Sequence, residues 1–154
     1  MPKSSYKIDM SVDERVMMAI VRVAEVFKKE SSAIFKHYSI TFAQYNVLRV
    51  LAASKDGQNT VRDINRIMLV SGPNMTGITK RMEKTGFIIR KSDPDDDRLK
   101  WLEITPKGKQ VLRSISDEKE RNVNKYLRNY SPDKKNEILS ILREILTGTT
   151  GMSF

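Results

Sequence analysis

The apolar residues of the chain fall into stretches with helical spacing, separated by short polar breaks. From Val12 to Phe35 they recur in steps of three, four and seven, which predicts one long helix over about residues 11–37. Additional apolar residues widen this stripe, so we expect the helix to pack against a second chain or several helices. Thr41, followed three residues later by Gln44, matches a capping box and predicts a second helix.

Two shorter helices follow the second one. Residues 55–59 are predicted to form a turn, after which Thr60 caps a short third helix. Pro73 suits the first turn of a fourth helix, and Gly86 suits a position just beyond its C-terminus. Two short helices joined by a tight turn are typical of a helix-turn-helix motif.

A β-hairpin is predicted next, because two strand-like segments flank a turn rich in Pro and Asp. The segments are residues 87–91 and 99–105, and the second alternates around Trp101. Beyond the hairpin, apolar residues at helical spacing predict two further helices, the second restarting at residues 131–133. The Gly- and Thr-rich tail, residues 147–154, is expected to be mobile.

The excess of positive charge in the chain indicates a negatively charged partner. Lys and Arg number 28 against 19 Asp and Glu, a formal net charge of +9 at pH 7. Such an excess attracts polyanions, either nucleic acid or an anionic membrane. No run of apolar residues is long enough to span a membrane, so we expect a soluble, cytoplasmic protein with no signal peptide and no membrane partner.

Composition also excludes several kinds of chemistry. The chain has no cysteine and a single histidine, His37. Disulfide frameworks, thiolate catalysis, Cys-ligated zinc and multi-His metal sites are therefore excluded, and we expect no cofactor and no metal. The acidic turn lacks the glycine and glutamate of a calcium loop. With no paired acidic site outside that turn, we do not expect an enzyme.

The fourth helix carries the strongest candidate site. Met75, Ile78 and Met82 fall within about 60° of one another and are predicted to be buried. The remaining face is polar and cationic, which suits a helix entering the major groove of DNA. An interior glycine costs about 1 kcal/mol relative to alanine, so a close approach to another molecule would explain Gly77. The alternative is an ordinary surface helix that tolerates a glycine. The candidate DNA-binding residues of this helix are Pro73, Asn74, Thr76, Gly77, Thr79, Lys80, Arg81 and Lys84.

The hairpin supplies a second group of candidates. Its cations are placed to straddle a phosphate backbone or to insert an arginine into the minor groove. Asp96, two residues before Arg98, is predicted to brace that arginine through a charge-assisted hydrogen bond. Asp93 and Asp95 are interpreted as solvated turn residues. The hairpin candidates are Arg90, Lys91, Asp96, Arg98 and Lys100.

Three segments in order resemble the MarR (multiple antibiotic resistance regulator) family. ITFAQYNVL, from Ile40, resembles the opening "LTxxQxxvL" of the family, and SGPNMTGITKRMEKTGFIIR resembles its recognition helix and the segment that follows. DPDDDRLKWLEITPKG resembles the family's wing, in which an Asp-x-Arg pair, here Asp96 and Arg98, precedes an "LTxxG" sequence ending here at Gly108. The resemblance covers about residues 40–110.

The resemblance implies a winged helix-turn-helix fold, mainly α-helical with a small β-hairpin wing. It also implies the following organisation: an N-terminal dimerisation helix and arm at 1–37, a DNA-binding region at 38–108, C-terminal dimerisation helices at 109–146 and a flexible tail at 147–154. A homodimer would place two recognition helices in successive major grooves of double-stranded DNA, at a pseudo-palindromic operator. Arg98 would enter the minor groove, braced by Asp96. The sequence departs from the family at Asp97, where a basic residue is frequent.

Members of this family usually repress transcription until a small aromatic or phenolic ligand binds. Candidates for such a site are Phe35, His37, Tyr38 and Tyr45, near the junction of the first two helices; the alternative is that they are core residues. A competing hypothesis for the whole chain is a winged-helix module that binds protein without specific DNA binding. The acidic run Asp95–Asp97 and Glu83 favour that hypothesis, whereas the net charge of +9 opposes it.

Overall fold

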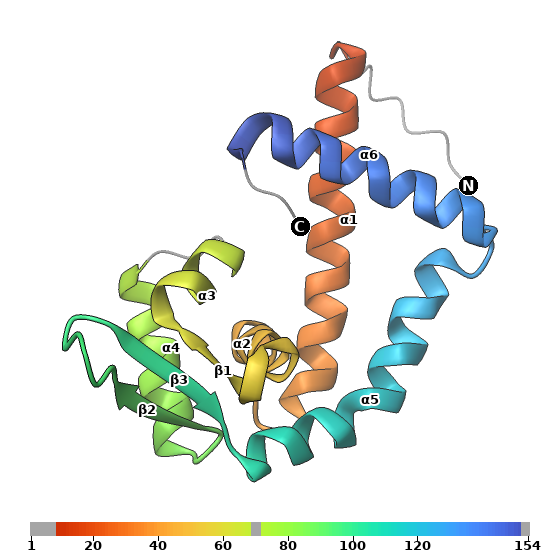
Figure 1. The fold of residues 1–154 in the computed structure, drawn as a ribbon. Helices are drawn as coiled ribbons and strands as arrows, with labels where there is room; N and C mark the ends of the chain where they lie inside the picture. Colours follow the sequence, from red (N-terminus) through yellow and green to blue (C-terminus); the bar gives the residue numbers. More distant parts are fainter. Residues whose placement is uncertain (1–8, 69–71, 152–154) are drawn as a thin grey trace. The chain divides into compact units, whose positions relative to one another are not determined.

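A computed structural model describes residues 9–68 and 72–151 of the chain (Figure 1). It divides into two compact units, one extending to Ile115 and the other starting at Ser116. None of the helices in the described part of the chain combines the length and the apolar character of a membrane-spanning segment. In chain order the elements are α1 (Val12–Lys36), α2 (Phe42–Ala53), the short 3-10 helix η1 (Lys55–Gly57), β1 (Gln58–Thr60), α3 (Val61–Met68), α4 (Gly72–Lys84), β2 (Ile88–Ser92), β3 (Lys100–Ile104), α5 (Pro106–Leu127) and α6 (Pro132–Thr150).

The predicted helices are confirmed, together with the caps that start two of them. Thr41 Oγ1 accepts a hydrogen bond from the Gln44 backbone at 3.1 Å, and Gln44 Oε1 accepts one from the Thr41 backbone at 3.1 Å. This reciprocal pair is the capping box predicted for α2. Thr60 Oγ1 accepts from the Asp63 backbone at 3.1 Å, as predicted for the start of α3. Both caps satisfy amides that the first turn of a helix leaves without an intrahelical partner.

The hairpin is also confirmed, but the sheet contains a third strand. The strand order is β1-β3-β2, with both pairs antiparallel. In the hairpin Ile88 lies opposite Ile104, and on the other edge of β3 Asn59 lies opposite Leu102. Gln58 and Asn59 were predicted to belong to a turn, but they are the first two residues of β1, and that prediction is wrong. A strand of three residues is too short to show an alternating pattern, and only its pairing with β3 defines it.

The core of the first unit lies between the sheet and the helices around it. Leu48, Ile64, Met82 and Leu102 come from α2, α3, α4 and β3, and each is fully buried. The last turns of α1 join this core through Phe35, whose ring stacks on Tyr45 with centroids 4.2 Å apart. The C-terminal end of the predicted dimerisation helix is therefore part of the same compact unit as the helix-turn-helix.

The end of α4 is defined by its predicted glycine. Gly86 has a φ of 83°, in the left-handed region that favours glycine. Its amide donates to Glu83 O at 3.0 Å, and the Phe87 amide donates to Met82 O at 2.9 Å. This pair of bonds is a Schellman motif, which closes the helix and turns the chain into β2.

The second unit contains the remainder of α5 and all of α6. Ser131 caps α6 by accepting from the Lys134 backbone at 3.2 Å, with Pro132 in the first turn. The helix continues to Thr150 and is capped by Gly151, whose φ is 69°. Residues 147–150 were predicted to belong to a mobile tail, but they form the last turn of α6. Residues 152–154 lie outside the described residues.

Candidate functional site

Helix α4 presents a polar, cationic face to solvent. Met75, Ile78 and Met82 are buried, as predicted from their spacing. Its exposed residues are Asn74, Thr76, Lys80, Arg81, Glu83 and Lys84, of which Glu83 is the one acid. The side chain of Pro73 lies outside the described residues, so its predicted role is untested. The exposed face begins with short side chains and becomes cationic toward its C-terminal half, as expected for a helix that approaches a polyanion with its N-terminal end.

Thr79 does not belong to this face, which corrects its prediction as a DNA contact. It is 0 % exposed, and its hydroxyl donates to Thr76 O at 3.3 Å. At about 100° per residue, Thr79 lies about 40° beyond Met75, so the buried surface of the helix extends past the edge of the apolar stripe. A small residue fits there against the core, and its hydroxyl is satisfied within the helix.

Gly77 has open space beside it. A Cβ at this position would lie 3.7 Å from the Arg81 guanidinium, an ordinary contact. Packing within the described residues therefore gives no reason for glycine in the middle of the helix. The half-exposed backbone leaves room for another molecule to approach closely, which keeps the prediction for Gly77 open.

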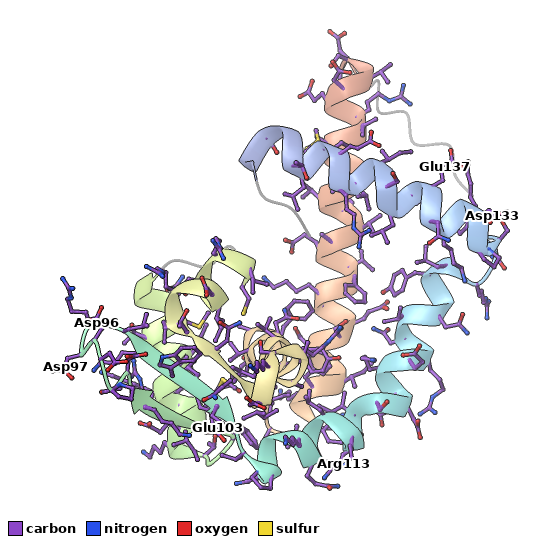
Figure 2. The ribbon with its side chains drawn as sticks, in the orientation of Figure 1. Asp96, Asp97, Glu103, Arg113, Asp133 and Glu137 are labelled. Atoms are coloured by element: carbon purple, nitrogen blue, oxygen red, sulfur yellow. The ribbon has the colours of Figure 1, made fainter. Side chains whose placement is uncertain are left out.

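At the tip of the hairpin, Asp96 and Arg98 form the predicted pair. Asp96 Oδ1 accepts from the Arg98 backbone at 3.0 Å and from Arg98 Nε at 3.2 Å. The arginine side chain is 92 % exposed, so its guanidinium is held at one edge and projects into solvent. Figure 2 shows Asp96 and Asp97 at this tip, far from Glu103 near the base of the hairpin.

Strand alternation separates the remaining cations of the hairpin. Arg90 and Lys100 lie on the same face of the strands, since they lie in register with Leu102 and Ser92 respectively. Lys91 lies on the opposite face, where its ammonium binds the carboxylate of Glu103. The structure therefore brings Arg90, Arg98 and Lys100 together and leaves Lys91 apart, already paired with an acid.

A cleft of about 570 Å³ lies between the hairpin and α3, and it contains residues that the sequence analysis missed. Arg62 is exposed on α3 and adds a cation to those of the hairpin. Asn65 lines the same cleft, and its Oδ1 is buried without a hydrogen-bond partner among the described residues. Arg62 and Asn65 are polar residues three positions apart on α3, a spacing that places them on one side of a helix and could have indicated this site from the sequence. The lining residues are Val61, Arg62, Asn65, Arg90, Asp96, Arg98, Leu99 and Lys100.

Asp93 has a structural role that corrects its interpretation as a solvated turn residue. One carboxylate oxygen accepts from the backbone amides of Asp95 and Asp96 at 2.8 and 3.2 Å. The other accepts from Trp101 Nε1 at 2.9 Å. The bond from Trp101, followed by the two amide bonds, lowers the pKa of Asp93 below its ordinary value of 3.8. Ionised Asp93 thus folds the tip back onto β3 and presents Arg98.

We expect acid to release the hairpin tip only below the ordinary pKa of Asp93. Because the folded-state pKa is lowered, the ionised carboxylate stabilises the tip at every pH above 3.8 and loses this effect as the pH falls through the folded value. Trp101 is the only tryptophan in the chain, so its emission reports on this bond. The emission should stay constant from about pH 7 to about pH 4 and change at lower pH, while far-ultraviolet circular dichroism tracks any loss of helix. An Asp93→Ala variant should lack this step. An identical step in the variant would show that another group titrates.

The predicted ligand-binding residues are not among those that line the pocket closest to them in the described part of the chain. Phe35 and Tyr45 are core residues, His37 is exposed as the C-cap of α1, and Tyr38 is half-buried against the core. This arrangement favours the alternative reading for Phe35 and Tyr45, because stacked rings exclude a ligand from between them. A pocket of about 590 Å³ lies beside them, bounded by α1, α2 and α3. Its lining residues are Lys28, Phe42, Ala43, Asn46, Arg49, Val50, Ala53, Ile67 and Met68. Among the described residues, no cluster of acidic or histidine side chains is suited to hold a metal ion.

The profile of the MarR family matches residues 38–99, which run from the end of α1 to the tip of the hairpin. The chain is 27 % identical over 135 residues to the transcriptional regulator YkoM of Bacillus subtilis, covering 85 % of this chain and 86 % of the relative. It is 21 % identical over 133 residues to the homoprotocatechuate degradative operon repressor of Escherichia coli, covering 86 % and 88 %.

Two solved structures share the fold. Sco3205, a MarR family transcriptional regulator from Streptomyces coelicolor in complex with DNA, matches with a TM-score of 0.83 and 17 % identity, covering 95 % of this chain and 93 % of that one. NadR in complex with 4-hydroxyphenylacetate matches with a TM-score of 0.74 and 21 % identity, covering 94 % and 97 %. At sequence identities of 17 % and 21 %, these two structures show a shared fold alone.

Proposed function

We propose that the chain is a transcription regulator of the MarR family and that it represses transcription by binding a pseudo-palindromic DNA operator as a homodimer. The observation that carries the proposal is that one compact unit presents both the polar face of α4 and the cations of the hairpin. Side chains on α4 are suited to read base edges in the major groove, and Arg98 is suited to the narrow minor groove. The DNA complex of the similar fold supports this use of the surface.

The homodimer is supported by apolar residues that the single chain leaves exposed. Most of the first half of α1 is exposed, including Val16, Met17 and Val23. In the second unit Leu127, Ile141 and Leu142 are exposed in the same way. Exposed apolar faces of this kind are stabilised when a second surface covers them. A two-fold dimer would present its recognition helices to half-sites about one helical turn, roughly 10 bp, apart.

We propose that a small phenolic acid relieves repression by binding the pocket between α1, α2 and α3. The pocket has an apolar wall that includes Phe42 and Val50, and it carries the cationic side chains Lys28 and Arg49. An aromatic ring suits the wall and a carboxylate suits the cations. The NadR complex, which contains 4-hydroxyphenylacetate, supports this class of ligand.

The experiment that tests the proposal is fluorescence anisotropy with a labelled duplex taken from upstream of the protein's own gene. Binding is titrated at two salt concentrations, with random-sequence competitor, and 4-hydroxyphenylacetate is added to the complex at the end. Tight binding that survives the competitor and falls with salt is expected, with release by the phenolic acid. Binding abolished by the competitor would contradict specific recognition. Unchanged anisotropy after the acid is added would contradict the ligand alone.

Lys80 should contribute one phosphate contact. It is exposed on α4 in the cationic half of the helix. If its ammonium neutralises one phosphate, Lys80→Ala should flatten the plot of log affinity against log salt by about 0.9. Lys36→Ala, which removes an exposed lysine from the last turn of α1, is the matched control and should leave the slope unchanged. An unaltered slope for Lys80→Ala would show that this side chain points away from the DNA.

The other function classes receive less support. Relatives named as regulators and repressors, and a shared fold bound to DNA, do not favour a module that binds only protein. The family consists of transcription regulators, and we propose no enzymatic activity. A regulator that binds chromosomal DNA acts in the cytoplasm, which we propose as its location.

A further inference from the structure

Three consecutive carbonyl oxygens at the end of α4 accept hydrogen bonds from the junction between β3 and α5. Thr85 O accepts from Lys107 Nζ at 2.6 Å. Gly86 O accepts from Thr105 Oγ1 at 2.5 Å, and Phe87 O accepts from the Thr105 backbone at 3.1 Å. Two segments about twenty residues apart in sequence are thereby joined at successive residues, so the end of α4 is attached to the start of α5.

Lys107 holds a defined position in this junction although it lies on the surface. Its Cδ lies 3.6 Å from where a Cβ on Gly86 would be, an ordinary van der Waals distance, so the lysine chain lies over this glycine. Its ammonium lies 5.2 Å from the centroid of the Phe87 ring, which attracts a cation. A positive charge at the C-terminus of a helix also interacts favourably with the helix dipole. Three attractions therefore hold the ammonium against the last turn of α4.

Along its length α4 is attached to the core through apolar side chains, so the hydrogen bonds at its end, including the one from Lys107, are the directional part of its attachment. Met75, Ile78 and Met82 anchor the helix to the core. Apolar burial is non-directional, so on its own it tolerates small slides and rotations of a helix, whereas hydrogen bonds do not. Reading a base edge requires side chains held to within about 0.5 Å. A directional bond at the end of the helix restricts the slides and rotations that would move these side chains away from the base edges.

We propose that Lys107 is a positioning residue for DNA recognition, acting through α4 rather than touching the DNA. The proposal rests on the proposed function, because it concerns how the recognition helix is held. Thr105 supplies the two neighbouring bonds but also begins the first turn of α5 by accepting from the Gly108 backbone at 3.1 Å. Lys107 is therefore the member of the junction whose side chain can be changed without disturbing the start of α5.

The test compares Lys107→Met, Lys107→Arg and Lys109→Met for operator affinity across a series of salt concentrations. Methionine keeps an unbranched apolar chain over Phe87 but removes the charge and the donor, whereas arginine keeps both. Lys109 is an exposed lysine two residues further along α5, and it matches the change in charge. We expect Lys107→Met to weaken specific binding about threefold to thirtyfold with an unchanged salt slope. Lys107→Arg should restore the affinity, and Lys109→Met should not lower it.

Two results in this comparison would overturn the proposal. A salt slope reduced by about one unit in Lys107→Met would mean that Lys107 contacts a phosphate directly. Unchanged specific affinity in Lys107→Met would mean that the bond to Thr85 does not position α4.

A second readout does not depend on DNA. Amide hydrogen exchange of residues 83–87 should be about fivefold faster in Lys107→Met than in Lys109→Met, with Lys107→Arg resembling the unchanged protein. If the unchanged protein binds no operator, the proposed function fails and exchange alone decides the inference. Equal exchange in all variants would then contradict a positioning role for Lys107.

Discussion

Replacing Arg98 by alanine should weaken operator binding by about tenfold to a hundredfold without changing the thermal stability of the protein. The side chain is 92 % exposed, so its removal exposes no core and leaves no cavity. Asp96 accepts one hydrogen bond from the Arg98 side chain and one from its backbone, and alanine keeps the backbone bond. The loss should therefore appear in binding alone.

A charge-matched control separates this contact from a general loss of positive charge. Arg113 lies on α5, is exposed, and donates to Gln110 Oε1 at 2.8 Å (Figure 2). Arg113→Ala removes the same charge and should change operator affinity about twofold or less. Arg98→Lys keeps the charge but loses the planar donor group, and should restore only part of the affinity. Full affinity in Arg98→Ala would remove the hairpin from the DNA interface.

Replacing Gly108 by alanine should destabilise the first unit by about 1–3 kcal/mol. A Cβ at this position would lie 2.5 Å from Phe87 O and 2.8 Å from Ile104 Cγ1. The carbonyl is fixed in place because it accepts from the Thr105 backbone. Alanine favours a helix by about 1 kcal/mol over glycine, but this gain is smaller than the cost of moving strand and helix apart. The change is measured as a shift in the urea midpoint at constant protein concentration.

The matched control is a glycine-to-alanine substitution at an exposed position within a helix. Gly148 lies within α6, and a Cβ there would meet no described atom within 4 Å. Gly148→Ala should be neutral or stabilising by up to about 1 kcal/mol. If both substitutions stabilise the protein equally, the tight approach of α5 to Phe87 is not what requires glycine at position 108.

Much of the fold was predictable because its signals are local. Apolar residues at helical spacing defined α1, α2 and the two C-terminal helices, and Thr41 with Gln44 defined the start of α2 within one residue. The pairing of Asp96 with Arg98 was also predictable, since two residues in a tight turn lie within reach of each other whatever the rest of the chain does.

The incorrect predictions concern residues whose partners lie elsewhere in the sequence or whose burial depends on tertiary packing. Strand β1 was missed because three residues have no period of their own, and their structure comes from pairing with β3. Asp93 was taken for a solvated residue because its partner Trp101 is eight positions away across the hairpin. Thr79 is polar and near the edge of the stripe, so hydrophobicity alone placed it on the wrong face.

The sequence by itself determined the kind of protein: the helices and their caps, the hairpin, the positive charge and the candidate recognition helix all follow from the order and spacing of side chains. Tertiary structure alone decided which of these groups act together. It brought Arg62 and Asn65 to the hairpin cations and turned Lys91 toward Glu103. It also placed Lys107 on the end of α4. The physical reason is that spacing along one helix or strand fixes the face on which a residue lies, whereas the partner opposite that face is set by how the whole chain packs.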